Sequence, residues 1–94
     1  MRRLRIPAGV AALVRGLHPE LKRKVRSALD EILRHPDRGK ALKQDLAGLR
    51  SWRLGRIRII YREQGTDVVE LVALGPRRTI YEETFRLLRR EERG

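Results

Sequence analysis

The sequence contains no cysteine, which excludes disulfide bonds and cysteine-ligated metals and fits a reducing cytoplasm. Its only two histidines, His18 and His35, lie at opposite ends of a predicted helix and are too far apart to share a metal ion. No apolar run approaches the roughly 18 residues needed to span a bilayer, and no glycine-rich phosphate loop is present. We therefore expect a cytoplasmic protein with no metal, no cofactor and no membrane partner.

Basic residues dominate what the sequence does contain. The 94 residues have 23 Lys and Arg against 12 Asp and Glu, which gives a formal net charge of +11. Only four of the basic residues are lysines, and the planar guanidinium of arginine suits two-point contacts to phosphate. This charge favours polyanionic partners, with nucleic acid first among them, but it does not identify a function.

The first half of the chain is predicted to be mainly helical. Residues 2–6 form a short edge strand, and residues 8–17 a short amphipathic helix. Apolar residues recur every three or four positions between residues 20 and 34, which indicates a second helix lying against a core. Residues 37–48 are polar and contain two glycines, so we expect a connecting loop with at most one helical turn.

The segment between residues 49 and 81 organises the rest of the chain. It is predicted to form three strands separated by a turn at Gly55 and a hairpin turn at Gln64-Gly65. The third strand, residues 68–74, is apolar on both faces except at Glu70 and ends at Gly75-Pro76. A last helix begins at residue 81 or 82, and residues 89–94 are expected to fray.

These elements predict one α+β domain covering residues 1–94, with the order β-α-α-β-β-β-α. Two N-terminal helices pack on one face of a mostly antiparallel sheet, and the C-terminal helix lies beside it. The segment between residues 49 and 81 carries seven arginines and three acidic residues. Antiparallel strands can bring such residues within about 5 Å of one another. They form either an anion site, where Tyr81 could stack on a base, or a solvated basic face without a ligand. Trp52 and Tyr61 are assigned to the core.

Two motifs in this segment resemble the RelE/ParE superfamily of bacterial toxin–antitoxin toxins. The first is LRSWRLGRIRIIY at residues 49–61, and the second is a strand ending in Gly75 followed by Arg77 and Tyr81. With the helices, the resemblance covers nearly all of residues 2–88.

The resemblance implies a toxin of the RelE type, a metal-independent endoribonuclease that cleaves mRNA on the ribosome. By motif position it implies four catalytic residues and further RNA-binding residues, with the cognate antitoxin, the ribosome and mRNA as partners. The implied catalytic residues are Arg58, Arg77, Tyr81 and Arg53, and the RNA-binding residues are Arg50, Arg56, Arg78 and Lys43.

The chain departs from the RelE pattern because its first sheet strand has no lysine. Arginine keeps its proton, so it cannot serve as the general acid, and the identity of that group stays open. Lys40 and Lys43, in the preceding loop, could reach the site. Two alternatives also remain: a ParE-like toxin that inhibits DNA gyrase without nuclease activity, and an inactive family member.

Overall fold

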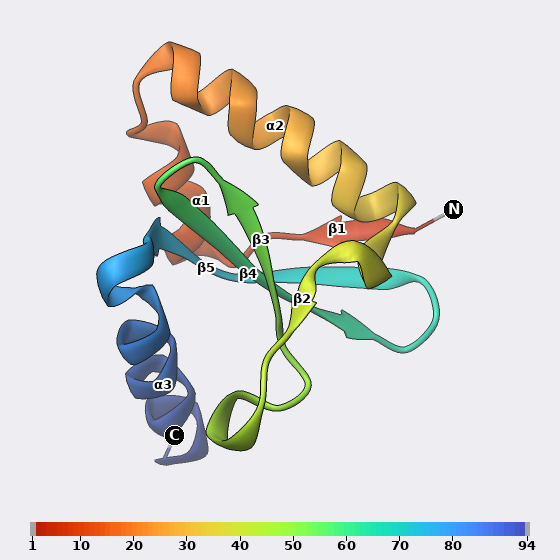
Figure 1. Ribbon diagram of the computed structural model, residues 1–94, viewed down its shortest axis with the longest axis vertical. Coiled ribbons are helices and arrows are strands. Elements are labelled where there is room, and N and C mark those ends of the chain that lie inside the picture. Colours follow the sequence, from red (N-terminus) through yellow and green to blue (C-terminus); the bar gives the residue numbers. More distant parts are fainter. Residues whose placement is uncertain (1, 94) are drawn as a thin grey trace.

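The computed structural model describes residues 2–93 as a sheet with helices on both faces (Figure 1). In chain order the elements are β1 (Arg3–Arg5), α1 (Ala8–Arg15), α2 (Pro19–Arg34), η1 (Pro36–Arg38), β2 (Lys40–Ala41), η2 (Gln44–Leu46), β3 (Arg50–Leu54), β4 (Ile57–Gln64), β5 (Val68–Pro76) and α3 (Arg77–Arg93), where η marks a 3₁₀ helix. The α+β class and the order β-α-α-β-β-β-α are confirmed. No helix among the described residues is long and apolar enough to cross a membrane.

The sheet has the order β1-β5-β4-β3-β2. Only β1 runs parallel to its neighbour, β5, and the other three pairings are antiparallel. The prediction of a mostly antiparallel sheet is therefore correct. Strand β2 is an addition, because it pairs two residues of the expected loop with Arg50 and Ser51 of β3.

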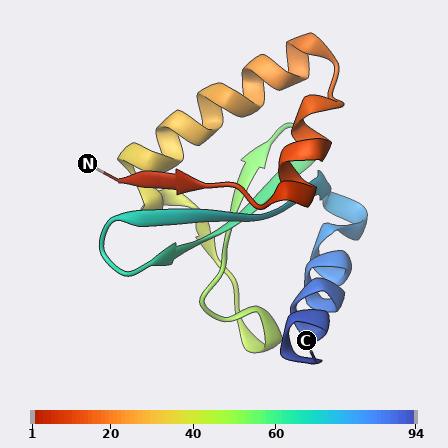
Figure 2. The ribbon, with the colours of Figure 1, turned by 180° about the vertical axis from the view of Figure 1, so that it is seen from behind.

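The two faces of the sheet bury separate apolar clusters. Helices α1 and α2 cover one face, where Val25 and Ile32 pack against Ile59, Tyr61 and other side chains of the sheet. Helix α3 covers the opposite face through Ile80, which packs with Leu49, Ile60 and Val72. Figures 1 and 2 show α2 and α3 on opposite sides of the sheet. The last helix thus packs on the face of the sheet opposite the two N-terminal helices.

A β-bulge in the central strand pair fits β5 to both clusters. Ile60 pairs with Ala73 and Tyr61 with Leu71, which leaves Val72 as an extra residue on β5. The bulge resets the alternation of side chains, so Leu71 and Leu74 both pack on the α1–α2 side while Val72 packs on the α3 side. For this reason β5 is apolar along its length, and its side chains do not alternate strictly between the two faces of the sheet.

The ends of the C-terminal elements differ from the predicted ones. Strand β5 continues through Gly75 and Pro76, and α3 begins at once with Arg77, four or five residues before the expected start. The hairpin loop after β4 comprises residues 65–67, with Gly65 at a φ of 65°, while Gln64 still belongs to the strand. Helix α3 includes residues 89–93 of the segment expected to fray, and Gly94 lies outside the described residues.

Candidate functional site

A groove of about 620 Å³ lies on the α3 side of the sheet, at the end where β3 turns into β4 and α3 begins. Five of the ten residues that line it are Arg or Lys, and none is acidic. The lining residues are Arg38, Gly39, Lys40, Leu42, Ser51, Trp52, Arg53, Arg58, Arg77 and Tyr81. The four residues implied to be catalytic, Arg53, Arg58, Arg77 and Tyr81, are thus brought together in one groove.

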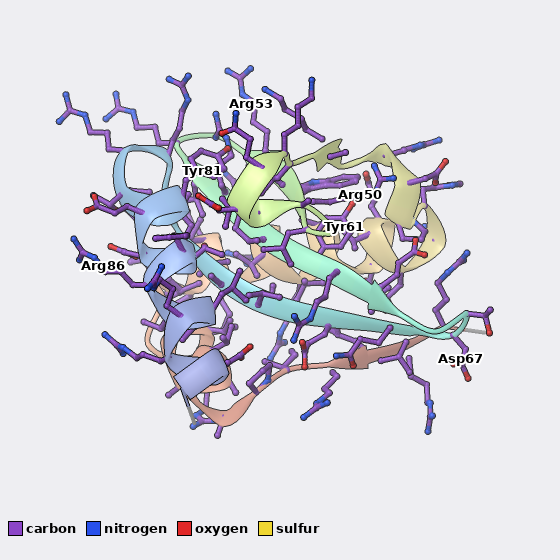
Figure 3. The ribbon with its side chains drawn as sticks, turned by 90° about the horizontal axis from the view of Figure 1, so that it is seen from below. Arg50, Arg53, Tyr61, Asp67, Tyr81 and Arg86 are labelled. Carbon is purple, nitrogen blue, oxygen red and sulfur yellow. The ribbon has the colours of Figure 1, made fainter. Side chains whose placement is uncertain are left out.

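Arg53 and Arg58 face each other across the β3–β4 hairpin as direct register partners. The hairpin turn, at Gly55 and Arg56, has Gly55 first with a φ of 60°, as a type II′ turn requires. Two like charges in register destabilise a sheet, so folding alone does not favour this pair. The exposed Arg53 lies at the same end of the molecule as Tyr81 in Figure 3.

Arg58 is largely enclosed, although it lines the groove. Its residue exposure is only 9%. One guanidinium nitrogen, Nη1, donates to the carbonyl oxygens of Gly55 at 2.9 Å and Ile57 at 3.0 Å. The side chain therefore braces the β3–β4 turn as well as lining the groove, and removing it costs stability.

Arg77 and Tyr81 reach the groove from the first turns of α3. They are four positions apart, so they lie on the same face of the helix. The backbone N–H of Arg77 donates to the carbonyl of Arg56 at 3.0 Å, which joins the helix start to the β3–β4 turn. The Tyr81 hydroxyl is 3.1 Å from Oγ of the buried Ser51, and this hydrogen bond fixes the phenol against β3.

Arg38 and Lys40 also line the groove. Arg38 was not predicted to belong to the site, whereas Lys40 was a loop residue that could reach it. Their segment is held from below by the phenol of Tyr61, which donates to the Pro36 carbonyl at 2.6 Å and accepts from Gly39 N–H at 3.0 Å. Tyr61 is fully buried, as expected. Burial raises the pKa of its phenol above the ordinary value, and the Gly39 N–H offsets part of that rise.

None of the four expected RNA-binding residues lines the groove itself. Arg50 is occupied elsewhere: its Nη1 donates to the carbonyls of Asp37 at 3.1 Å and Gly39 at 2.8 Å, so it braces the η1–β2 segment. Lys43, just before η2, is exposed but is not among the lining residues. Both residues lie outside the groove, and their contact with RNA stays a prediction.

Arg56 and Arg78 line a second hollow of about 750 Å³ that adjoins the groove. The two hollows share Arg53, Arg58 and Arg77. The basic surface is therefore continuous around the β3–β4 turn and the start of α3. The first turn of α3 contains no acid that would neutralise it.

This arrangement can bind an anion of the size of a phosphodiester and neutralise charge that develops on it. Guanidinium groups come from β3, β4 and α3, and the phenol of Tyr81 supplies an aromatic surface at the groove wall. Such a site suits a flexible single strand of nucleic acid, whose phosphates and unstacked bases remain accessible.

Comparisons with known proteins agree with the fold. No curated protein sequence matches that of this chain. The structure is similar to a chain in the crystal structure of the toxin–antitoxin complex RelBE2 from Mycobacterium tuberculosis, with a TM-score of 0.72 and 28% sequence identity. The match covers 81% of this chain and 98% of the other.

A family model matches most of the sequence. It describes the ParE toxin of the type II toxin–antitoxin system parDE, and it matches residues 12–81, from α1 to the first turns of α3. The matched range includes both hairpins and every residue that lines the groove. The chain therefore belongs to the ParE toxin family, within the RelE/ParE superfamily of type II toxin–antitoxin toxins.

Proposed function

We propose that this toxin is a ribosome-dependent endoribonuclease that cleaves mRNA and so stops translation. The observation that carries the proposal is the convergence of Arg53, Arg58, Arg77 and Tyr81, from three different elements, on one groove without a carboxylate. Arginines could also contact an acidic protein surface, but such a contact does not require guanidinium groups to converge on one hollow. An enzyme that stabilises a phosphorane-like transition state does.

The proposed reaction is an internal transesterification of RNA. The 2′-oxygen attacks the neighbouring phosphorus, and the bond from phosphorus to the 5′-oxygen breaks. Arg58 and Arg77 contact the non-bridging oxygens, where negative charge increases during the reaction, and Arg53 holds the adjoining backbone. Tyr81 stacks on or orients the base beside the scissile phosphate. The groove has no imidazole or carboxylate that could hold a metal ion, so the charge neutralisation is assigned to the arginines.

We also propose that a cognate antitoxin binds the chain. The structurally similar chain belongs to a toxin–antitoxin complex, and an acidic or mixed-charge partner would relieve the repulsion within a domain of net charge +11. The basic groove is the natural docking surface for acidic side chains of such a partner. Co-expression with the adjacent gene is expected to suppress toxicity and to yield a complex that co-purifies.

Inhibition of DNA gyrase is the second candidate function. The observation in its favour is the matching family model, which describes the ParE toxin rather than a ribonuclease. On this alternative the same arginines would contact an acidic surface of gyrase or its DNA, and no bond in RNA would be cut.

Two parallel assays of the purified protein separate the candidates. One measures cleavage of mRNA with and without programmed ribosomes, and the other measures DNA supercoiling by gyrase. We expect cleavage that requires ribosomes and leaves supercoiling unaffected. Inhibited supercoiling together with intact mRNA would show that the ribonuclease assignment is wrong.

Substitutions then test the proposed roles. Arg77→Ala is expected to slow cleavage on the order of 10²–10³-fold, because it removes a donor to developing charge. Arg77 is exposed. The melting temperature of the Arg77→Ala variant should therefore stay close to that of the wild type. Arg58→Lys retains the charge of Arg58 but loses the fork that braces the turn, and therefore needs a check of folding. Arg26→Ala, exposed on α2, is the matched control and should cleave normally.

A further inference from the structure

Phe85 is the aromatic residue of this chain that belongs to neither apolar cluster. The chain has four aromatic residues, and the structure describes all of them. Trp52 and Tyr61 pack on the α1–α2 side of the sheet, and Tyr81 packs on the α3 side. The ring of Phe85 is only half-buried. Helix α3 therefore carries an accessible aromatic surface that the packing of the sheet does not use.

This ring lies on the flank of α3 that continues from the groove. Residues three or four positions apart share one side of an α-helix. The residues at these intervals on the flank are Arg78, Tyr81, Phe85 and Arg89. Tyr81 lines the groove and Arg78 lines the adjoining hollow. Four residues of helix advance by about 6 Å, so Phe85 is the next aromatic surface beyond Tyr81 along the helix.

The flank is basic as well as aromatic. The guanidinium carbon of Arg89 lies 5.6 Å from the centroid of the Phe85 ring, near the outer limit of about 6 Å for a cation–π contact. Arg89 is exposed, so its guanidinium is free to turn from the ring toward an anion. Glu82, three positions before Phe85, is paired with Arg86 at 2.5 Å, which compensates its charge locally.

Helix stability alone does not favour a ring at position 85. A Phe–Arg pair four positions apart contributes only weakly to a helix. Leucine forms helix better than phenylalanine does, and it would cover the same side of α3. An aromatic side chain between two arginines is instead the combination that single-stranded nucleic acid requires, with a ring for the base and cations for the phosphates.

We propose that Phe85, between Arg78 and Arg89, forms a subsite for one nucleotide of the mRNA strand beyond those held in the groove, and this inference rests on the proposed ribonuclease function. The base stacks on the ring of Phe85, next to the base at Tyr81. The guanidinium groups of Arg78 and Arg89 contact the phosphates on either side. Continuity with the basic groove and the charge of the flank select a single strand of RNA as the occupant. Every base has a π-face, so the subsite accepts any of the four.

Two RNA chains of equal length and charge separate contact with a base from contact with phosphate. One is a short 2′-O-methyl oligoadenylate, which cannot be cleaved, and the other is the same chain with all bases removed. Fluorescence anisotropy compares the wild type with Phe85→Leu, Phe85→Trp and Arg89→Ala. Leucine keeps an apolar side chain without a ring, whereas tryptophan keeps the ring. Arg26→Ala, exposed on α2, is the matched control for Arg89→Ala.

We expect Phe85→Leu to bind oligoadenylate roughly 5–100-fold more weakly than the wild type and to bind the abasic chain equally well. Phe85→Trp should bind oligoadenylate at least as tightly as the wild type. Arg89→Ala should weaken binding to both chains and lower the slope of log affinity against log salt by about 0.7. Arg26→Ala should leave both affinities nearly unchanged. The melting temperature of each Phe85 variant should stay close to that of the wild type, because the ring packs in neither cluster.

The proposal is wrong if Phe85→Leu binds oligoadenylate as tightly as the wild type does. It is also wrong if this variant loses affinity for both chains equally, because Phe85 then acts through the shape of the helix rather than by stacking. Unchanged RNA binding together with lost co-purification of the antitoxin would assign the flank to the antitoxin instead. Cleavage on programmed ribosomes reports separately on the ribonuclease assignment. Intact mRNA refutes that assignment, while base-dependent binding through Phe85 still supports the subsite.

Discussion

Tyr61 shows how a single buried side chain places residues that it does not touch. Its phenol joins the carbonyl of Pro36 to the N–H of Gly39, and these two backbone groups flank the short helix that carries Arg38. In Figure 3 Tyr61 lies next to Arg50, the second residue that fixes this segment. The wall of the groove that holds Lys40 is therefore built on a core residue.

Tyr61→Phe should destabilise the protein by about 1–3 kcal/mol at neutral pH, because two buried backbone groups lose their partner. The pKa of Tyr61 is raised in the folded state by burial, so the unfolded chain ionises first as the pH increases. The stability that the phenol contributes is present below pH 10, near the unfolded pKa, and is lost as the pH rises through the folded pKa.

Urea unfolding of wild type and Tyr61→Phe between pH 7 and pH 11 measures this dependence. The difference in stability between the two proteins should be constant up to about pH 9 and should narrow above pH 10. A difference that stays constant across the whole range would show that the Tyr61 phenol does not titrate with unfolding.

At the scale of elements, one row of charges crosses three strands. Glu70 of β5 is the register partner of Arg5 in β1 and of Arg62 in β4. Its carboxylate accepts from Arg62 Nε at 2.7 Å and Nη2 at 2.6 Å, and lies 3.4 Å from Arg5 Nη1. The side chain of Glu70 is only 7% exposed, so this acid is paired inside an otherwise apolar strand.

Glu70→Ala should therefore lower the free energy of unfolding by on the order of 2 kcal/mol, because it leaves the half-buried guanidinium of Arg62 unpaired. Arg5→Ala should cost well under 1 kcal/mol, since the Arg5 side chain is 65% exposed. Chemical denaturation of the single variants and of the double variant Glu70→Met with Arg62→Met measures these costs. A double variant less stable than Glu70→Ala would contradict the expected role of the unpaired charge.

Elements with a strong local pattern could be predicted from the sequence, and those that depend on distant pairing could not. Helix α2 and strand β4 follow from periodicity over 16 and 8 residues. Strand β2 has two residues and exists only because β3 lies beside it. Helix α3 starts earlier than expected because its first turn is made of polar residues, Arg77 to Thr79, which show no apolar period.

The residues of the candidate site also differ in whether local sequence or distant contacts determine their positions. Arg53 and Arg58 could be brought together in advance, because they flank a two-residue turn whose glycine is visible in the sequence. Lys40 could be named as a candidate but not placed in the groove, since its position depends on the hydrogen bonds of Tyr61 and Arg50 to a segment more than ten residues away. The place of Arg50 could not be predicted for the same reason, because its side chain donates to backbone carbonyls of that distant segment.

At the scale of the whole molecule, net charge sets how binding responds to salt. With +11 on 94 residues and a continuous basic surface around the start of α3, single-stranded RNA should bind through several phosphate contacts. Each contact releases counterions, so a plot of log affinity against log salt concentration should fall with a slope of about 0.7 per phosphate.

Fluorescence anisotropy with a short labelled RNA between low and physiological salt measures that slope. Arg53→Ala should weaken binding and reduce the slope by about 0.7, corresponding to one lost phosphate contact. Arg26→Ala, on the far side of the sheet, should change the slope less. A flat dependence on salt would indicate that the basic surface is merely solvated.

The facing pair of Arg53 and Arg58 has a consequence for how this protein can change under selection. Two like charges in register oppose pairing of β3 with β4, and the exposed Arg53 is the member whose loss leaves no buried group unsatisfied. Replacing Arg53 by a β-branched residue should therefore leave the fold as stable as before or slightly more so. Nothing in the requirements of folding retains an arginine at this position, and a lineage that no longer needs the groove is expected to lose Arg53 before it loses Arg58.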